Sequence, residues 1–260
     1  MTLAAVFLLF ATQAMEHYHR ANTLFAEQKF AEAANEVEAA LAVDPKLVPA
    51  LTLKAKLAMA INKFDIARAC LQSAASFEPN SYYVQFLLGF FYYVDNDFSK
   101  AIPVLERARI LKADDIRTHF YLALAFEGIA EPQKARALYE RTLELETAAG
   151  KPSAETHVAF GRLLFTLGEY DASEKHIGRA LNLDGKSRDA HYETGRLHFE
   201  HRRYEEAAAA GERALKFPGA GTTDRQIHFL LARCYRKLGK TELAESHLAK
   251  FHASGTSLRR

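Results

Sequence analysis

Histidine is the residue type in this sequence that most invites a metal site, because imidazole is a common ligand of transition metals. The chain has 11 histidines, and five of them recur at related intervals: His17, His119, His157, His191 and His228. If the interval marks stacked helices, successive members lie roughly 10 Å apart. That is too far to share an ion whose ligands lie about 2 Å from it. We therefore predict a structural column of packed or hydrogen-bonded histidines.

Other arrangements typical of catalysis or cofactor binding are weak or missing. His198 and His201 are one helical turn apart and could chelate weakly, but His198 is expected to face the interior. The motifs G-x-G-x-x-G, G-x-S-x-G and H-E-x-x-H do not occur. Gly239-Lys240-Thr241 resembles the end of a phosphate-binding loop, but Cys234 stands where that loop needs its first glycine. We predict no enzyme, no catalytic residue, no metal and no cofactor.

Composition places the chain among foldable proteins. It has 260 residues, 49% hydrophobic and 25% charged, with 7 Pro and 13 Gly, which excludes a disordered, collagen-like or disulfide-scaffold chain. A formal net charge of +2 excludes a strongly basic nucleic-acid binder as the default. Cys70 and Cys234 are too far apart in the repeat order for a disulfide, so we expect two small buried side chains.

A repeat of about 34 residues organises the sequence. Small residues recur at intervals of 34, 34, 34, 38, 34 and 37: Ala21, Ala55, Gly89, Ala123, Gly161, Gly195 and Ala232. Twelve residues later a second small column follows: Ala33, Ala67, Ala101, Ala135, Ser173, Ala207 and Ala244. Each repeat predicts two amphipathic helices, such as Ser81–Val94 and Ser99–Lys112, joined by a short polar turn.

This pattern resembles the tetratricopeptide repeat (TPR) family, which has a small residue in its first helix, an aromatic near the turn and alanine in its second helix. The resemblance implies an all-α, right-handed superhelical solenoid of antiparallel helix pairs. We predict seven repeats over 14–258: 14–47, 48–81, 82–115, 116–149, 154–187, 188–221 and 225–258. Extra residues separate repeats four and five, and repeats six and seven.

Residues 1–13 are predicted to be an apolar leader. Met1 to Met15 carries no charged side chain, and the apolar run Leu3 to Ala11 is shorter than the roughly 20 residues that span a bilayer. Thr12-Gln13-Ala14 is a small-residue cleavage site, so we expect a signal peptide and an exported, periplasmic or secreted protein. The alternative is a cytoplasmic protein in which a short apolar helix lies on the first repeat.

The resemblance also implies that the first helices line a concave groove, and two surfaces are expected there. The aromatic patch comprises Tyr83, Phe86, Phe90, Tyr93 and Phe120. The arginine ladder comprises Arg162, Arg196, Arg233 and Arg236, interleaved with Phe165, Tyr192, Phe199 and Phe229. Charge supports the division, because residues 1–149 carry 15 Lys+Arg and 18 Asp+Glu (net −3), whereas residues 150–260 carry 19 and 14 (net +5).

We therefore predict a non-catalytic scaffold that binds a protein or peptide with acidic and apolar groups, since arginine pairs with carboxylates and stacks on rings. The competing interpretation makes the rings part of the core and pairs the arginines with Glu155, Glu193 and Glu200. Envelope and pilus-biogenesis TPR proteins provide an analogy for the setting. Two alternative functions remain open, a helical repeat that binds single-stranded RNA and the regulatory arm of a larger enzyme.

Overall fold

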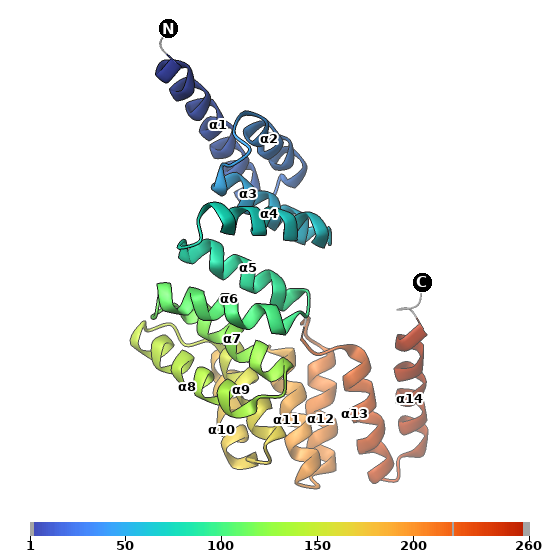
Figure 1. Cartoon of the computed structure of the whole chain (residues 1–260). Coiled ribbons are helices and arrows are strands. Elements are labelled where there is room, and N and C mark those ends of the chain that lie inside the picture. The colour runs from blue at the N-terminus through green and yellow to red at the C-terminus, as the bar shows by residue number, and fades with distance from the viewer. Residues whose placement is uncertain (1–2, 220, 257–260) are drawn as a thin grey trace. The chain divides into compact units, whose positions relative to one another are not determined.

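The computed structural model describes residues 3–219 and 221–256, and within them the chain forms fourteen helices and no strand (Figure 1). The helices are α1 (Leu3–Ala26), α2 (Phe30–Val43), α3 (Val48–Ala60), α4 (Phe64–Phe77), α5 (Tyr82–Val94), α6 (Phe98–Leu111), α7 (Ile116–Gly128), α8 (Pro132–Ala148), α9 (Ala154–Thr166), α10 (Tyr170–Leu183), α11 (Arg188–Glu200), α12 (Tyr204–Leu215), α13 (Asp224–Lys237) and α14 (Thr241–Thr256). Consecutive odd and even helices form pairs. The predicted all-α solenoid of paired helices is confirmed.

The chain divides into two compact units, Met1–Leu138 and Tyr139–Arg260, and the division falls inside α8. In the first unit, α1 with α2, α3 with α4, and α5 with α6 make the most extensive helix contacts. In the second unit the corresponding pairs are α9 with α10, α11 with α12, and α13 with α14. First helices of neighbouring repeats also touch within each unit, for example α5 with α7 and α9 with α11.

The two small-residue columns lie where paired helices approach most closely. Ala21 and Ala33 are fully buried and pack with Val37 between α1 and α2. A Cβ atom on Gly89 would lie 2.6 Å from Cγ of Leu105, and one on Gly161 would lie 2.6 Å from Cδ1 of Ile177. These distances are shorter than van der Waals contact. The observed close spacing of the paired helices is therefore possible only with a small residue at these positions.

Each first helix is followed, two residues after its last residue, by a residue with a left-handed backbone. Seven such residues occupy the same place in the seven pairs: Gln28, Asn62, Asn96, Ala130, Gly168, Arg202 and Gly239. At Asn96 φ is 58°. This conformation ends a helix and satisfies its last carbonyl groups, which is why a turn of a few residues is enough to reverse the chain. Only two of the seven are glycine, although glycine adopts this conformation most easily.

The extra residues between repeats are fixed to the second unit by hydrogen bonds. Glu146 accepts hydrogen bonds from Ser153 N at 3.0 Å and from Thr156 Oγ1 at 2.5 Å. In the later insertion, Arg188 donates to the Phe217 carbonyl at 3.2 Å and forms an ion pair with Asp224. These contacts fix the inserted segments, so α9 and α13 still pack as the first helices of their repeats.

The first helix is longer than its counterparts. α1 has 24 residues, whereas α3 has 13, so one helix runs through most of the predicted leader and into the first repeat. The Leu3–Ala26 sequence contains no Gly or Pro that would end the helix between them. Over the described part of the chain, no helix combines the length and the apolar character that crossing a bilayer requires.

Candidate partner-binding surfaces

The aromatic patch belongs to the first unit, on α5 and α7, and its members differ in exposure. The Tyr83 side chain is exposed, and Phe90 and Tyr93 are half-buried. Phe86 and Phe120, in contrast, are buried at 6% and 7% exposure. A partner can therefore contact the first three directly, whereas the last two belong to the packing between helices.

Tyr121, which the sequence analysis did not select, connects the rings of this patch. Its ring centroid lies 4.7 Å from that of Phe90, 5.4 Å from that of Tyr93 and 5.4 Å from that of Phe120. The equivalent position one repeat earlier is Leu87. Tyr121 therefore does not belong to a column of aromatic residues that recurs from repeat to repeat. The edge-to-face contact with Phe90 orders the half-exposed ring.

Cations cover part of the aromatic patch. The Lys56 ammonium lies 5.2 Å from the ring centroid of Tyr83, and the Arg117 guanidinium lies 4.6 Å from that of Phe86. Both separations are within cation–π range. The patch is thus a mixed surface in which aliphatic stems and charged groups surround a few accessible rings.

The arginine ladder lies in the second unit, on α9, α11 and α13, and two of its guanidinium groups stack on rings of the preceding repeat. Cζ of Arg196 lies 4.0 Å from the ring centroid of Phe165. One repeat later, Cζ of Arg233 lies 4.1 Å from the ring centroid of Phe199. The repeated contact brings the predicted arginines and phenylalanines together and restricts the arginine side chains before any partner binds.

The members of the ladder differ in how their charge is compensated. Arg196 pairs with Glu193 at 2.7 Å, and Glu193 is only 5% exposed. Burial raises the pKa of Glu193, while the charges of Arg196 and Arg162 oppose that rise. Arg196 is therefore largely compensated by its own helix, as the competing interpretation expected for Glu193.

Arg233 and Arg236 are the less compensated end of the ladder. Both are exposed, and neither has a carboxylate partner within salt-bridge distance among residues 3–219 and 221–256. Phe229, on the same helix, is 45% exposed. This end therefore offers positive charge and ring surface together.

A hollow of about 540 Å³ adjoins this exposed end. Its lining consists of Phe199, Glu200, Arg202, Tyr204, Arg233, Arg236 and Lys237. Four of these side chains are cationic and one is a carboxylate, so the hollow favours an anionic group. Arg202 and Lys237 were missed because the groove positions considered in the sequence excluded the turns and the helix ends where these residues lie.

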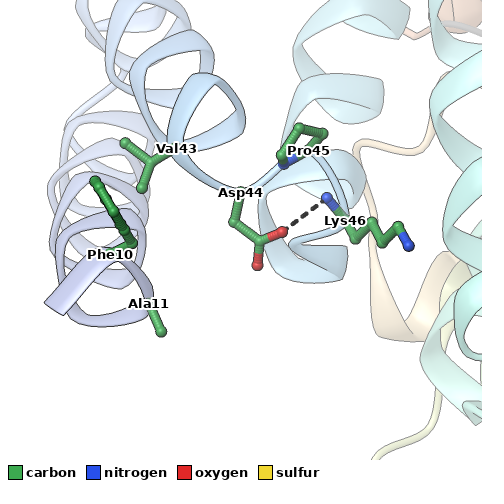
Figure 2. Close-up of a pocket in the computed structure, with 6 residues that line it drawn as sticks. All are labelled: Phe10, Ala11, Val43, Asp44, Pro45 and Lys46. Atoms are coloured by element: carbon green, nitrogen blue, oxygen red, sulfur yellow. Dashed lines mark hydrogen bonds between the residues drawn. The ribbon is translucent and has the colours of Figure 1, made fainter. Parts of the chain in front are cut away.

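A second hollow, of about 450 Å³, lies at one end of the first repeat and is mainly apolar. Phe10 and Ala11 on α1 line this hollow together with Val43, at the end of α2, and Pro45 in the following turn (Figure 2). Within this turn the Lys46 amide donates to Oδ1 of Asp44 at 3.0 Å. Part of the predicted leader thus contributes to a surface of the first repeat.

The five histidines of the predicted column make local hydrogen bonds. His119 Nδ1 lies 3.0 Å from the Asp115 carbonyl, and His191 Nε2 lies 3.0 Å from the Gly185 carbonyl. Each interaction joins a first helix to the turn that precedes it, at the boundary between two repeats. In these two repeats the imidazole takes part in packing and turn structure.

The other three column members each meet a polar partner 19 residues later. His17 Nδ1 lies 2.7 Å from Oε2 of Glu36. His157 and His176 approach through their Nδ1 atoms at 3.0 Å, and His228 and His247 do so at 3.1 Å. No group of three or more His, Cys, Asp or Glu side chains arranged to hold a metal is found in the part of the chain that the structure describes.

The two cysteines are buried free thiols in the helices expected to contain them. Burial raises the pKa of the Cys234 thiol to about 11, and burial also raises the pKa of Cys70. Both are therefore thiols rather than reactive thiolates at neutral pH.

Comparison with solved structures identifies the fold. A tetratricopeptide repeat protein from Parabacteroides merdae aligns with a TM-score of 0.74 at 15% identity, over 93% of this chain and 93% of that one. Pseudomonas aeruginosa PilF aligns with a TM-score of 0.68 at 17% identity, over 81% of this chain and 95% of that one. The Cut9–Hcn1 complex of the APC/C gives 0.66 at 16% identity, over 89% of this chain and 44% of the matched chain.

Sequence comparison gives the same family. No curated protein matches the sequence. Family models for the tetratricopeptide repeat, however, match residues 24–87, 158–221 and 226–251. Together with the fourteen paired helices, these matches show that the chain belongs to the tetratricopeptide repeat family and has about seven repeats.

Proposed function

We propose that this protein is a non-catalytic scaffold whose first helices hold an extended or helical segment of a protein partner. The family and fold support a role in protein–protein interaction. In this proposal, acidic side chains of the partner meet the arginine ladder, and apolar side chains meet the exposed rings of the aromatic patch. The observation that carries the proposal is the cationic hollow beside Arg233 and Arg236.

The stacking of the arginines on rings favours binding of a carboxylate. A guanidinium held over a ring loses less conformational freedom when a carboxylate binds, so less of the interaction energy offsets ordering. Arg233 stacks on Phe199 at 4.1 Å while its charge remains unpaired within the described residues. A charge-assisted hydrogen bond to such a group contributes about 1.5–3 kcal/mol. Arginine and aromatic residues are also frequent hot spots of protein interfaces.

A double charge reversal tests the proposal. The variant Arg196→Glu with Arg233→Glu should reduce capture of an acidic partner segment at least tenfold, because it replaces attraction by repulsion. The matched control is Arg179→Glu with Arg213→Glu, which changes net charge equally on exposed positions of α10 and α12. Quantitative mass spectrometry of captured proteins, followed by titration with synthetic acidic peptides from them, measures the effect. Equal capture by both variants would exclude the proposed surface.

Single-stranded RNA is the competing ligand, since rings interleaved with arginines also suit stacked bases. Titration of the full chain with homopolymer RNA at two salt concentrations separates the two functions. A protein-binding scaffold predicts no sequence-independent, salt-dependent affinity. RNA affinity that falls steeply with salt and is lost in the ladder variant would replace the proposal.

We also propose that the protein is exported and works in a cell-envelope assembly. The uncharged N-terminal segment and its small-residue cleavage site support this proposal, together with the analogy to envelope TPR proteins. The mass of the protein purified from its source organism tests it. Export predicts a mature chain that begins close to Met15, whereas retention of Met1 through Ala14 in the mature protein would contradict it.

A further inference from the structure

The histidine pair between α13 and α14 has an arrangement that a packing role does not require. His228 lies on α13 and His247 on α14, with their Nδ1 atoms 3.1 Å apart and ring centroids 5.2 Å apart. His247 is 7% exposed. Only one of the two Nδ1 atoms can carry the hydrogen of this contact, so one ring donates and the other accepts.

Glu212 fixes which nitrogen of His247 carries hydrogen. Nε2 of His247 lies 3.3 Å from Oε1 of Glu212, and an ionised carboxylate only accepts hydrogen bonds. Nε2 is therefore the protonated nitrogen, which leaves the Nδ1 lone pair of the neutral ring directed at His228. The Tyr235 hydroxyl donates to the same Glu212 oxygen at 3.3 Å and holds the carboxylate in place.

The hydrogen bond from His247 to a fixed carboxylate is typical of imidazoles that bind metal ions. A ligating histidine commonly donates its other N–H to a carboxylate, which orients the ring and raises its basicity. Two nitrogen ligands at about 2.0–2.1 Å from one ion are about 3 Å apart when the angle between them is near 90–100°. The observed 3.1 Å separation of the Nδ1 atoms matches that distance, so the imidazole rings must rotate to face the ion but the helices need not move.

Charge around the pair is compatible with a cation. Carboxylates of Glu212 on α12 and Asp224 on α13 act on His228, and so does the Lys250 ammonium on α14. Glu212 and Lys250 also act on His247.

We propose that His228 and His247 bind one divalent transition-metal ion through their Nδ1 atoms, with water completing its coordination. The class of ion is the one that prefers imidazole, Zn²⁺, Ni²⁺ or Cu²⁺. His228 accommodates the ion by moving its hydrogen from Nδ1 to Nε2. The ion joins the two helices of the last repeat, and this function is independent of partner binding.

The His157–His176 pair supplies a second site of the same kind. Its Nδ1 atoms are 3.0 Å apart, and its two residues have the same 19-residue separation on α9 and α10. The site belongs to one repeat, so it differs from the column of stacked histidines, whose members are too far apart to share an ion. The full chain is therefore expected to bind two ions.

Isothermal titration of the untagged full chain with ZnCl₂ at pH 7.5 tests the proposal. The wild type should bind two equivalents, and His228→Gln should bind one. The matched control is His252→Gln, which removes an exposed histidine of α14 and should leave two equivalents. Equal stoichiometry and affinity in wild type and His228→Gln, or no binding by the wild type, would overturn the site.

Thermal unfolding of the same proteins provides a second readout. An ion that binds only the folded chain raises the melting temperature, so ZnCl₂ should stabilise the wild type and His252→Gln more than His228→Gln. Far-UV circular dichroism without metal checks that the variants are folded. An equal Zn²⁺-induced shift in all three proteins would show nonspecific binding and exclude the pair, which would then be only a neutral hydrogen bond.

Discussion

Single residues with small side chains determine how closely the helices of a pair approach. Gly89 on α5 faces Leu105 on α6, and an added Cβ would lie 2.6 Å from Leu105 Cγ and 3.2 Å from its backbone nitrogen. Neither atom is the mobile end of a side chain. A methyl group here must therefore separate the two helices or shift their backbone.

We predict that Gly89→Ala lowers the free energy of unfolding by about 1–3 kcal/mol, the usual range for overpacking. Urea unfolding followed by circular dichroism measures the change. The control is Gly178→Ala on α10, where nothing lies within 4 Å of the added Cβ. That variant should be more stable than wild type by up to about 1 kcal/mol, because alanine favours the helix. Destabilisation by both variants would mean that helix packing is not the cause.

The partly buried imidazoles make stability depend on pH. Burial and the neighbouring charges of His176 and Arg179 lower the pKa of His157 from 6.5 to about 4, so the folded chain holds this ring neutral. The unfolded chain binds the proton first as pH falls. Stability is therefore fully present above pH 6.5 and is lost as pH falls from about 6.5 towards 4.

The free energy of unfolding of the wild type should fall between pH 7.5 and pH 4.5. We predict that, in buffer with EDTA, this fall is smaller in His157→Gln by about 2–3 kcal/mol, the free energy that corresponds to the pKa shift of His157. Urea unfolding at the two pH values gives the difference. His252→Gln serves as the comparison for removal of an exposed histidine. A pH dependence unchanged in His157→Gln would mean that this ring does not titrate on unfolding.

The residue scale also shows the limits of the sequence. The Ala21 and Ala33 columns were predictable because every repeat needs a close helix contact at the same place. Tyr121 and the His228–His247 contact were not, because each depends on side chains that only one or two repeats possess. The stacking of Arg233 on Phe199 required knowledge of which neighbouring helix each side chain faces.

At the scale of elements, the turns after the first helices share one backbone conformation although their residue types differ. All seven first helices are followed, two residues later, by a left-handed residue, yet these residues include Gln28, Ala130 and Arg202. A search for glycine would have found only two of these turns. α1 likewise continues across the predicted end of the leader, because no Gly or Pro interrupts the helix there.

The turn after α7 offers a direct test. Ala130 is exposed and has φ of 57°, a conformation that is unfavourable for a residue with a Cβ by about 1–2 kcal/mol. Ala130→Gly should therefore stabilise the protein by about 1 kcal/mol, measured by urea unfolding. The reverse effect is expected for Ala137→Gly, an exposed position inside α8, which should lose about 1 kcal/mol. Destabilisation by Ala130→Gly would contradict this account of the turn.

At the scale of the whole molecule, net charge is the property that the composition conceals. The total of +2 combines a net −3 over residues 1–149 with a net +5 over residues 150–260. In the second unit the positive charge includes the hollow lined by Arg233, Arg236 and Lys237. Electrostatic attraction over such a surface mainly accelerates encounter with an oppositely charged partner.

The rate constant for association with an acidic peptide should therefore fall at least several-fold when ionic strength rises from 20 mM to 300 mM, because screening shortens the range of the attraction. The dissociation rate constant should change less, since stacked and partly buried contacts are screened less. Stopped-flow mixing measures both constants. Arg233→Glu with Arg236→Glu should remove most of the salt dependence, whereas Arg179→Glu with Arg213→Glu should retain more of it. Equal salt dependence in the two variants would assign the effect to net charge alone and would separate it from the hollow.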